Sequence, residues 1–148
     1  MDMERHFTVA IFIVHKGRTL LHLHMKLGRW LPVGGHVDAK ESLCEAAIRE
    51  AKEESGLNIR LMGHRPMIAP MNEHLHELIP PLYMQNERIG PDHEHIDAIF
   101  YATSDSADLT PDHHEASIIG WYTKEDLDQL PLQNDVKAYA IEALEMLS

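Results

Sequence analysis

Three glutamates that recur within about one turn of a predicted helix are the residues of this chain best suited to bind a metal ion. Glu50, Glu53 and Glu54 are spaced i, i+3 and i+4, so their side chains share one face of the helix. Carboxylates placed this close repel one another unless water or a cation separates their charges. Hard divalent ions such as Mg²⁺ take oxygen ligands, commonly one or two carboxylates together with substrate phosphates. The spacing therefore indicates a divalent-metal site on this helix.

The residues around these glutamates favour a site that handles a diphosphate. Arg49 directly precedes Glu50 and can pair with Glu41 or Glu53, which would orient the acidic cluster. Upstream, Gly34 and Gly35 let the backbone bend or approach a ligand closely, so a carbonyl could face the metal without a side chain in the way.

The order of these residues matches a known motif. It reads Gly35-x5-Glu41-x7-Arg49-Glu50-Ala51-x-Glu53-Glu54-x-Gly56-Leu57 and follows Trp30-Leu-Pro-Val-Gly-Gly. This pattern resembles the Nudix box of the Nudix hydrolases at every fixed position. Ala51 departs mildly from it, because that slot usually holds a bulky aliphatic residue.

The resemblance implies an α/β fold, an α/β/α sandwich around a mixed sheet. It also implies hydrolysis of a diphosphate bond in a nucleoside diphosphate linked to another moiety, such as a nucleoside triphosphate or a nucleotide sugar, with Mg²⁺ or Mn²⁺ as cofactor. Carried over by position, the expected roles fall on six residues. The principal metal ligands would be Glu50 and Glu54, with the Gly34 carbonyl as a backbone ligand. Glu53 would be an additional ligand and a catalytic residue. Arg49 and Glu41 would form the pair that joins the helix to the loop, and they also count among the catalytic residues.

The resemblance also implies a further carboxylate, contributed by a loop across the site as a metal ligand or general base. Glu115 is our candidate, because it ends a polar loop six residues before Trp121. Glu94, Glu73 and Glu77 are alternatives. The sequence does not show which of these four glutamates is the further carboxylate.

Two helices and several strands must position these groups. Ser42 and Glu45 form a capping box, and Gly56 is a typical C-terminal stop, which predicts a helix over residues 43–55. A second amphipathic helix should close the chain from Val136, capped by Asn134 or Asp135. Strands are predicted from apolar runs or alternation over residues 8–14, 21–27, 58–62, 96–103 and 118–123. Five prolines indicate a loop-rich excursion over residues 63–95, with a short strand near 82–85, and a polar loop follows over 103–115.

Length, charge and cysteine content limit the functions open to the chain. Its 148 residues suit a single domain over residues 1–148. The net charge of −11 opposes binding to nucleic acid or anionic membranes, so we expect a small nucleotide derivative as the partner. The single Cys44 and the lack of a long apolar run or leader-like start favour the cytoplasm. A homodimer is compatible with the resemblance, but the oligomeric state cannot be predicted.

Twelve histidines raise the question of a zinc site. His93 with His95, or His113 with His114, could coordinate a metal. No Cys/His spacing of the structural-zinc type occurs, however, so we favour surface or pocket contacts for these side chains.

Two other functions compete with hydrolysis. A Nudix-like module could sense a nucleotide without cleaving it, although such modules usually have a damaged box and this box is intact. An isopentenyl diphosphate isomerase would need an extra reactive cysteine, and Cys44 inside the predicted helix is poorly placed for that role.

Overall fold

The computed structural model describes residues 2–110 and 118–147. Its strands are β1 (Glu4–His15), β2 (Arg18–His24), β3 (Arg29–Leu31), β4 (Val33–His36), β5 (Ile59–Leu61), β6 (Tyr83–Gly90), β7 (His93–Ser104) and β8 (Ile118–Tyr122). Its helices are α1 (Leu43–Ser55), α2 (Lys124–Leu127) and α3 (Asn134–Leu147). Among the described residues, none of the helices has the length and apolar character needed to cross a membrane.

The strands form one mixed sheet around a parallel central pair, β1 and β7. On its other edge β1 pairs antiparallel with β2 at its C-terminal end and with β4 in its middle, at residues 8–11. On its own outer edge β7 pairs antiparallel with β5 and with β6. The β-branched and aromatic run of β1 suits this central position, because a strand covered on both faces is apolar throughout.

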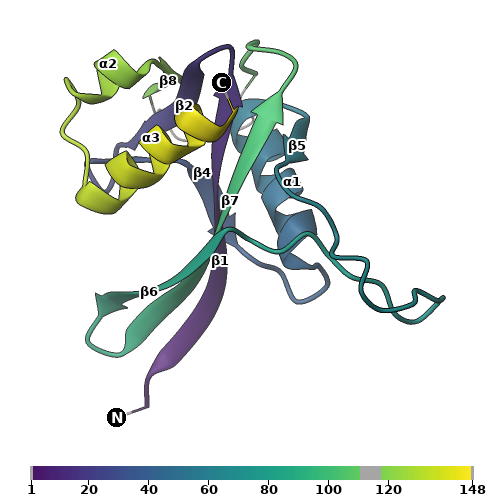
Figure 1. The fold of residues 1–148 in the computed structure, drawn as a ribbon. Coiled ribbons are helices and arrows are strands. Elements are labelled where there is room, and N and C mark those ends of the chain that lie inside the picture. The colour runs from purple at the N-terminus through teal and green to yellow at the C-terminus, as the bar shows by residue number, and fades with distance from the viewer. Residues whose placement is uncertain (1, 111–117, 148) are drawn as a thin grey trace.

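Helices cover both faces of the sheet, as Figure 1 shows. Alternate residues of β1 point to opposite faces. Val9, Ile11 and Ile13 pack toward α1, whereas Phe12 and Val14 pack toward α3. The predicted α/β/α sandwich around a mixed sheet is confirmed.

Helix α1 has the predicted bounds and the predicted caps. The Ser42 side chain accepts a hydrogen bond from the Glu45 backbone amide, and the Glu45 carboxylate accepts one from the Ser42 amide. Gly56 ends the helix in the left-handed conformation, with φ of 80°. Ala46, Ala47 and Ala51 are buried against the sheet, and their small side chains let the helix backbone lie close to it.

Three predictions about the elements were wrong in detail. The alternation over residues 21–27 predicted one strand, but β2 ends at His24, where a turn brings the Gly28 amide to the His24 carbonyl and leaves Met25 exposed. The excursion over residues 63–95 contains more strand than expected, because β6 and the start of β7 form the hairpin at the lower left of Figure 1. Helix α3 begins at Asn134, so the expected capping residues lie in its first turn, and the short α2 was not predicted.

Candidate active site

A glycine-bearing strand lies directly against the carboxylates of α1. Strand β4 pairs with β1 and contacts α1. The Gly34 amide donates a hydrogen bond of 2.8 Å to Oε2 of Glu54. At Gly35, a Cβ atom would lie 2.5 Å from Oε1 of Glu50, so only glycine leaves room for that carboxylate. The glycine pair thus seats Glu50 and Glu54 side by side at the edge of the sheet.

This position makes both carboxyl groups hard to ionise. Burial raises the pKa of Glu54 to about 8, against the opposing effect of the Gly34 amide, and the nearby Glu50 adds to the rise. Burial also raises the pKa of Glu50, although Arg49 partly offsets it. His22 places Nε2 3.9 Å from Oε1 of Glu54. Two adjacent, partly buried carboxylates whose charges are incompletely balanced are a donor set suited to a hard cation.

Arg49 connects the acidic residues of the helix with the loop before it. Its guanidinium donates to both oxygens of Glu41, at 2.6–3.2 Å. The same group donates to Glu50 at 3.0 Å, to Glu53 at 3.1 Å and to the His36 carbonyl at 3.0 Å. The planar fork of arginine permits these simultaneous contacts.

Glu41 is held from two directions. Besides Arg49, the Asp38 amide donates to it at 2.9 Å. These hydrogen bonds, first that of Arg49, lower the pKa of Glu41, and the partnership with Glu41 in turn raises the pKa of Arg49. Glu41 therefore stays ionised and anchors the loop to the helix.

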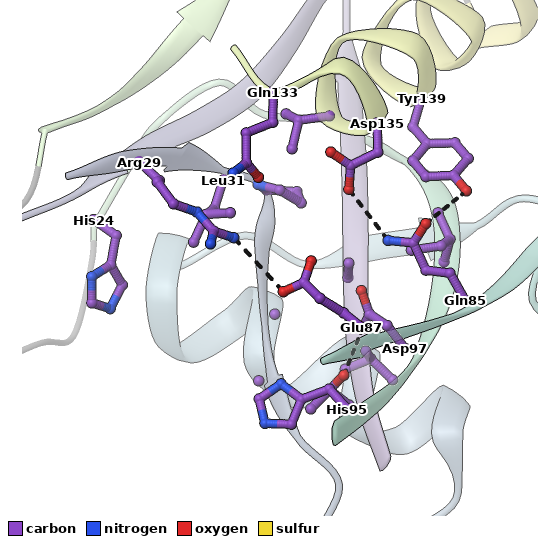
Figure 2. A pocket seen from close by; sticks show the side chains of 18 of the residues that line it. His24, Arg29, Leu31, Gln85, Glu87, His95, Asp97, Gln133, Asp135 and Tyr139 are labelled. Atoms are coloured by element: carbon purple, nitrogen blue, oxygen red, sulfur yellow. Dashed lines mark hydrogen bonds and ion pairs between the residues drawn. The ribbon is translucent and has the colours of Figure 1, made fainter. Parts of the chain in front are cut away.

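A cavity of about 660 Å³ opens beside the carboxylate pair. Gly34, Gly35 and Glu54 form part of its wall, and most of the remainder comes from strands β1, β2, β3, β6 and β7 and from the start of α3. Figure 2 shows Arg29 directed toward Glu87, with the two side chains 3.9 Å apart. The volume falls within the range of small-molecule sites.

The far end of the cavity is lined by hydrogen-bonding groups from β6 and α3. Tyr139 donates from its hydroxyl to Oε1 of Gln85 at 3.1 Å, and Gln85 donates to Asp135 at 3.4 Å (Figure 2). This series of hydrogen-bonded side chains offers donors and acceptors to the polar ring of a ligand. It lies across the cavity from Arg29, one of two arginines in the lining and a cationic side chain that could meet phosphate.

Burial changes the ionisation of two groups on the floor of the cavity. It raises the pKa of Asp97 to about 6, although a hydrogen bond of 2.8 Å from Thr8 opposes the rise. Burial also lowers the pKa of His95, and the rings of neighbouring histidines add to this effect.

The structure brings together the predicted residues of α1 and β4, and it places three of the four candidate loop carboxylates outside the cavity lining. Glu115 lies outside the described residues, as do His113 and His114. Glu94 accepts hydrogen bonds from Arg5 and Asn86, and it does not line the cavity. Neither do Glu73, an exposed residue, and Glu77, which accepts from the Ala69 amide.

Sequence reasoning missed the cavity residues on the strands and on α3. They are Arg29, Gln85, Glu87, Asp97, Asp135 and Tyr139. No motif contains them. The strand registers bring together those on β3, β6 and β7, and the packing of α3 against the sheet adds Asp135 and Tyr139. The one usable signal was the amphipathic pattern of α3, which identified Tyr139 only as part of an apolar stripe.

The chain is similar in sequence and in fold to known proteins. The family model described as the NUDIX domain matches residues 4–144. A NUDIX-family hydrolase from Clostridium perfringens is 40% identical, with a TM-score of 0.85 over 99% of this chain and 100% of that one. The MutT NUDIX hydrolase of Burkholderia pseudomallei is 26% identical, with a TM-score of 0.63 over 98% and 99% of the two chains.

More distant structures share the fold. The NUDIX domain of NrtR from Shewanella oneidensis, crystallised with ADP ribose, is 18% identical, with a TM-score of 0.65 over 100% of this chain and 90% of that one. Among curated proteins, none matches the chain.

Proposed function

The chain belongs to the NUDIX family of pyrophosphohydrolases, and we propose that it cleaves the diphosphate bond of a nucleoside diphosphate linked to another moiety. Members of this family generally act on such compounds and generally use divalent metal ions. One observation carries the proposal: Glu54, paired with Glu50 against the glycine strand, also lines a cavity large enough for a nucleotide derivative.

The donor set fits a hard divalent ion, Mg²⁺ or Mn²⁺. Glu50 and Glu54 would be the principal ligands, with Glu53 and the Gly34 carbonyl as further ones. Glu50 and Glu54 are partly buried and Glu53 is exposed, and their carboxylates supply the oxygen donors that such ions prefer. When bound, the ions would neutralise phosphate charge and lower the pKa of a bound water.

The chain's own residues orient the ligands and receive the substrate. Arg49 holds Glu50 and Glu53 in place and is itself fixed by Glu41, so the carboxylates need little rearrangement when substrate binds. Arg29 lies on the cavity wall, where its guanidinium can donate to a phosphate. On the family resemblance, Glu115 stays our candidate for the further carboxylate, as a metal ligand or general base.

The polar end of the cavity is suited to the nucleoside. Gln85 and Asp135 offer an amide and a carboxylate, and the ring of Tyr139 adds an apolar face. The ADP ribose bound by the NrtR domain makes nucleotide sugars sensible first substrates to test, beside nucleoside triphosphates.

We also propose that residues 1–148 act as one domain, in the cytoplasm, without a nucleic-acid or membrane partner. The net charge of −11 supports this, because polyanions would be repelled. The divalent ions would then also make an anionic substrate bindable.

Replacing Glu54 or Glu50 by glutamine tests the proposal. Purified protein is assayed with Mg²⁺ and then Mn²⁺ against nucleoside triphosphates, nucleotide sugars, ADP ribose and dinucleoside polyphosphates. We expect Glu54→Gln and Glu50→Gln to lose about two to three orders of magnitude in kcat, since each removes a group that holds charge at the reacting phosphates.

Glu145→Gln is the matched control, because this exposed glutamate of α3 lies outside the cavity and, among the described residues, pairs only with Lys124. It should keep the parent rate. Parent-like rates in both active-site variants would show that the ligands are assigned wrongly. Nucleotide binding without turnover of any compound would instead favour a sensing module.

A further inference from the structure

Four histidines from three strands meet on the face of the sheet that bears the cavity. His6 comes from β1, His36 from β4, and His93 and His95 from β7. The strand registers explain the meeting, because His6 lies opposite His95 while Thr8, two residues further along β1, lies opposite His36. Side chains two residues apart on a strand share a face. The cluster is therefore built into the sheet.

The ring nitrogens are close enough to share one ion. One ligand nitrogen from each of His6, His36 and His95 lies within 4.8 Å of the others. The rings of His36 and His95 have centroids 5.0 Å apart, and those of His6 and His36 lie 5.4 Å apart. Nitrogens around a tetrahedral zinc ion lie about 3.4 Å from each other, so small ring rotations would suffice.

One of these nitrogens is buried and finds no hydrogen-bond partner among residues 2–110 and 118–147. Nε2 of His95 is shielded from solvent, and no hydrogen bond reaches it in the described part of the chain. A buried polar atom without a hydrogen-bond partner destabilises the fold, because it has lost its contacts with water and gained none in return. A metal ion at the centre of the cluster would give this nitrogen the partner that it lacks.

A carboxylate orients a second ligand. Glu4 lies 2.9 Å from Nε2 of His6. A carboxylate only accepts, so Nε2 carries the proton and Nδ1 keeps its lone pair. That Nδ1 faces Nε2 of His93 at 2.9 Å. Histidines that bind metals commonly donate their other nitrogen to a carboxylate in this way.

We propose that His6, His36 and His95 form a binding site for a transition-metal ion of the zinc class, with Glu4 orienting His6. Imidazole suits zinc, nickel and copper, whereas the glutamates of α1 suit magnesium and manganese. The two sites therefore select different ions. His36 and His95 also line the cavity, so an ion held here adds positive charge to the wall beside the diphosphate site.

Calorimetric titration with ZnCl₂ in excess MgCl₂ tests the proposal. The magnesium occupies the glutamate site, and we expect one tight zinc per chain. His95→Asn should weaken zinc binding by at least about 100-fold, since it removes a ligand, and Glu4→Gln by about 10- to 100-fold, since it removes the orienting group. Titration with Co²⁺ should give the visible absorption of a nitrogen-ligated ion, lost in His95→Asn.

Two variants serve as controls. His74→Asn removes an exposed histidine of the loop before β6, whose ring pairs only with Glu73 in the part of the chain that the structure describes. Glu54→Gln alters the other metal site. Both should keep the tight zinc. Circular dichroism in EDTA checks that each variant folds, and Glu4, 71% exposed, can be replaced without disturbing the core. Three results would overturn the proposal. They are no zinc binding by the parent, equal zinc binding by His95→Asn and the parent, and loss of zinc binding in Glu54→Gln.

Discussion

The two glycines of β4 should respond to alanine in opposite ways, although they are neighbours. At Gly35 the added methyl group would meet the end of the Glu50 side chain, 2.5 Å from Oε1. At Gly34 it would overlap the carbonyl oxygen of Val9 in the central strand. A side-chain end can move aside, whereas a backbone carbonyl inside the sheet cannot.

The size of each effect follows from these contacts. Ordinary van der Waals contact begins near 3.4 Å, so Gly35→Ala must push the Glu50 carboxylate away by about 1 Å. A misplacement of this size in a catalytic site can cost about 100-fold in rate. Gly34→Ala forces β4 away from β1, and overpacking of this kind costs about 1–3 kcal/mol. For a domain of this length, that lowers Tm by roughly 3–10 °C.

Thermal unfolding and steady-state kinetics on the best substrate measure both effects. We expect Gly35→Ala to keep the parent Tm within about 2 °C while kcat/KM falls about 100-fold. Gly34→Ala should show the loss of Tm. If Gly35→Ala retained the parent kcat/KM, the position of Glu50 would not matter to the reaction, and the proposed site would be wrong.

Three other substitutions test the surroundings of the site. Arg49→Lys should lower kcat and reduce the free energy of unfolding by about 1–3 kcal/mol, because a lysine cannot keep every contact of the guanidinium. Urea unfolding at pH 7 measures this loss, and an unchanged free energy would show that the guanidinium contacts are unimportant. Arg29→Met should raise KM about 10- to 100-fold at unchanged Tm if Arg29 contacts a phosphate, and an unaltered KM would exclude that contact. For Asp97, the folded-state pKa of about 6 exceeds the ordinary value of 3.8, so between these values the folded chain holds a proton that the unfolded chain has lost. The stability contributed by this group therefore falls as pH rises through that window. In urea unfolding at pH 4–7, Asp97→Asn should make the free energy of unfolding depend less on pH. An equal pH dependence in the variant and the parent would refute the burial argument.

Local chemistry explains why the helix of the site was predictable. Glu50, Glu53 and Glu54 share a face through helix geometry alone, and Ser42 and Gly56 mark the ends of that helix within a few residues of chain. Strand β1 was equally clear, because its apolar run needs burial on both faces. Arg49 was expected to pair with Glu41 or Glu53, and it contacts both.

Where strands pair, the sequence carries no comparable information. The end of β2 at His24 was missed because the apolar alternation continues to Leu27, although the chain turns before it. Residues 86–95 were expected to be irregular, since prolines surround them, yet they extend the β6–β7 hairpin.

By itself, the sequence determined the carboxylate helix, the glycine pair facing it and the family to which they point. The tertiary structure decided what surrounds them: the cavity between Arg29 and Tyr139, and the meeting of His6, His36 and His95. The physical reason is distance along the chain. A helix relates residues three or four positions apart by its own geometry, whereas a sheet joins residues far apart through a register that only the packed fold selects.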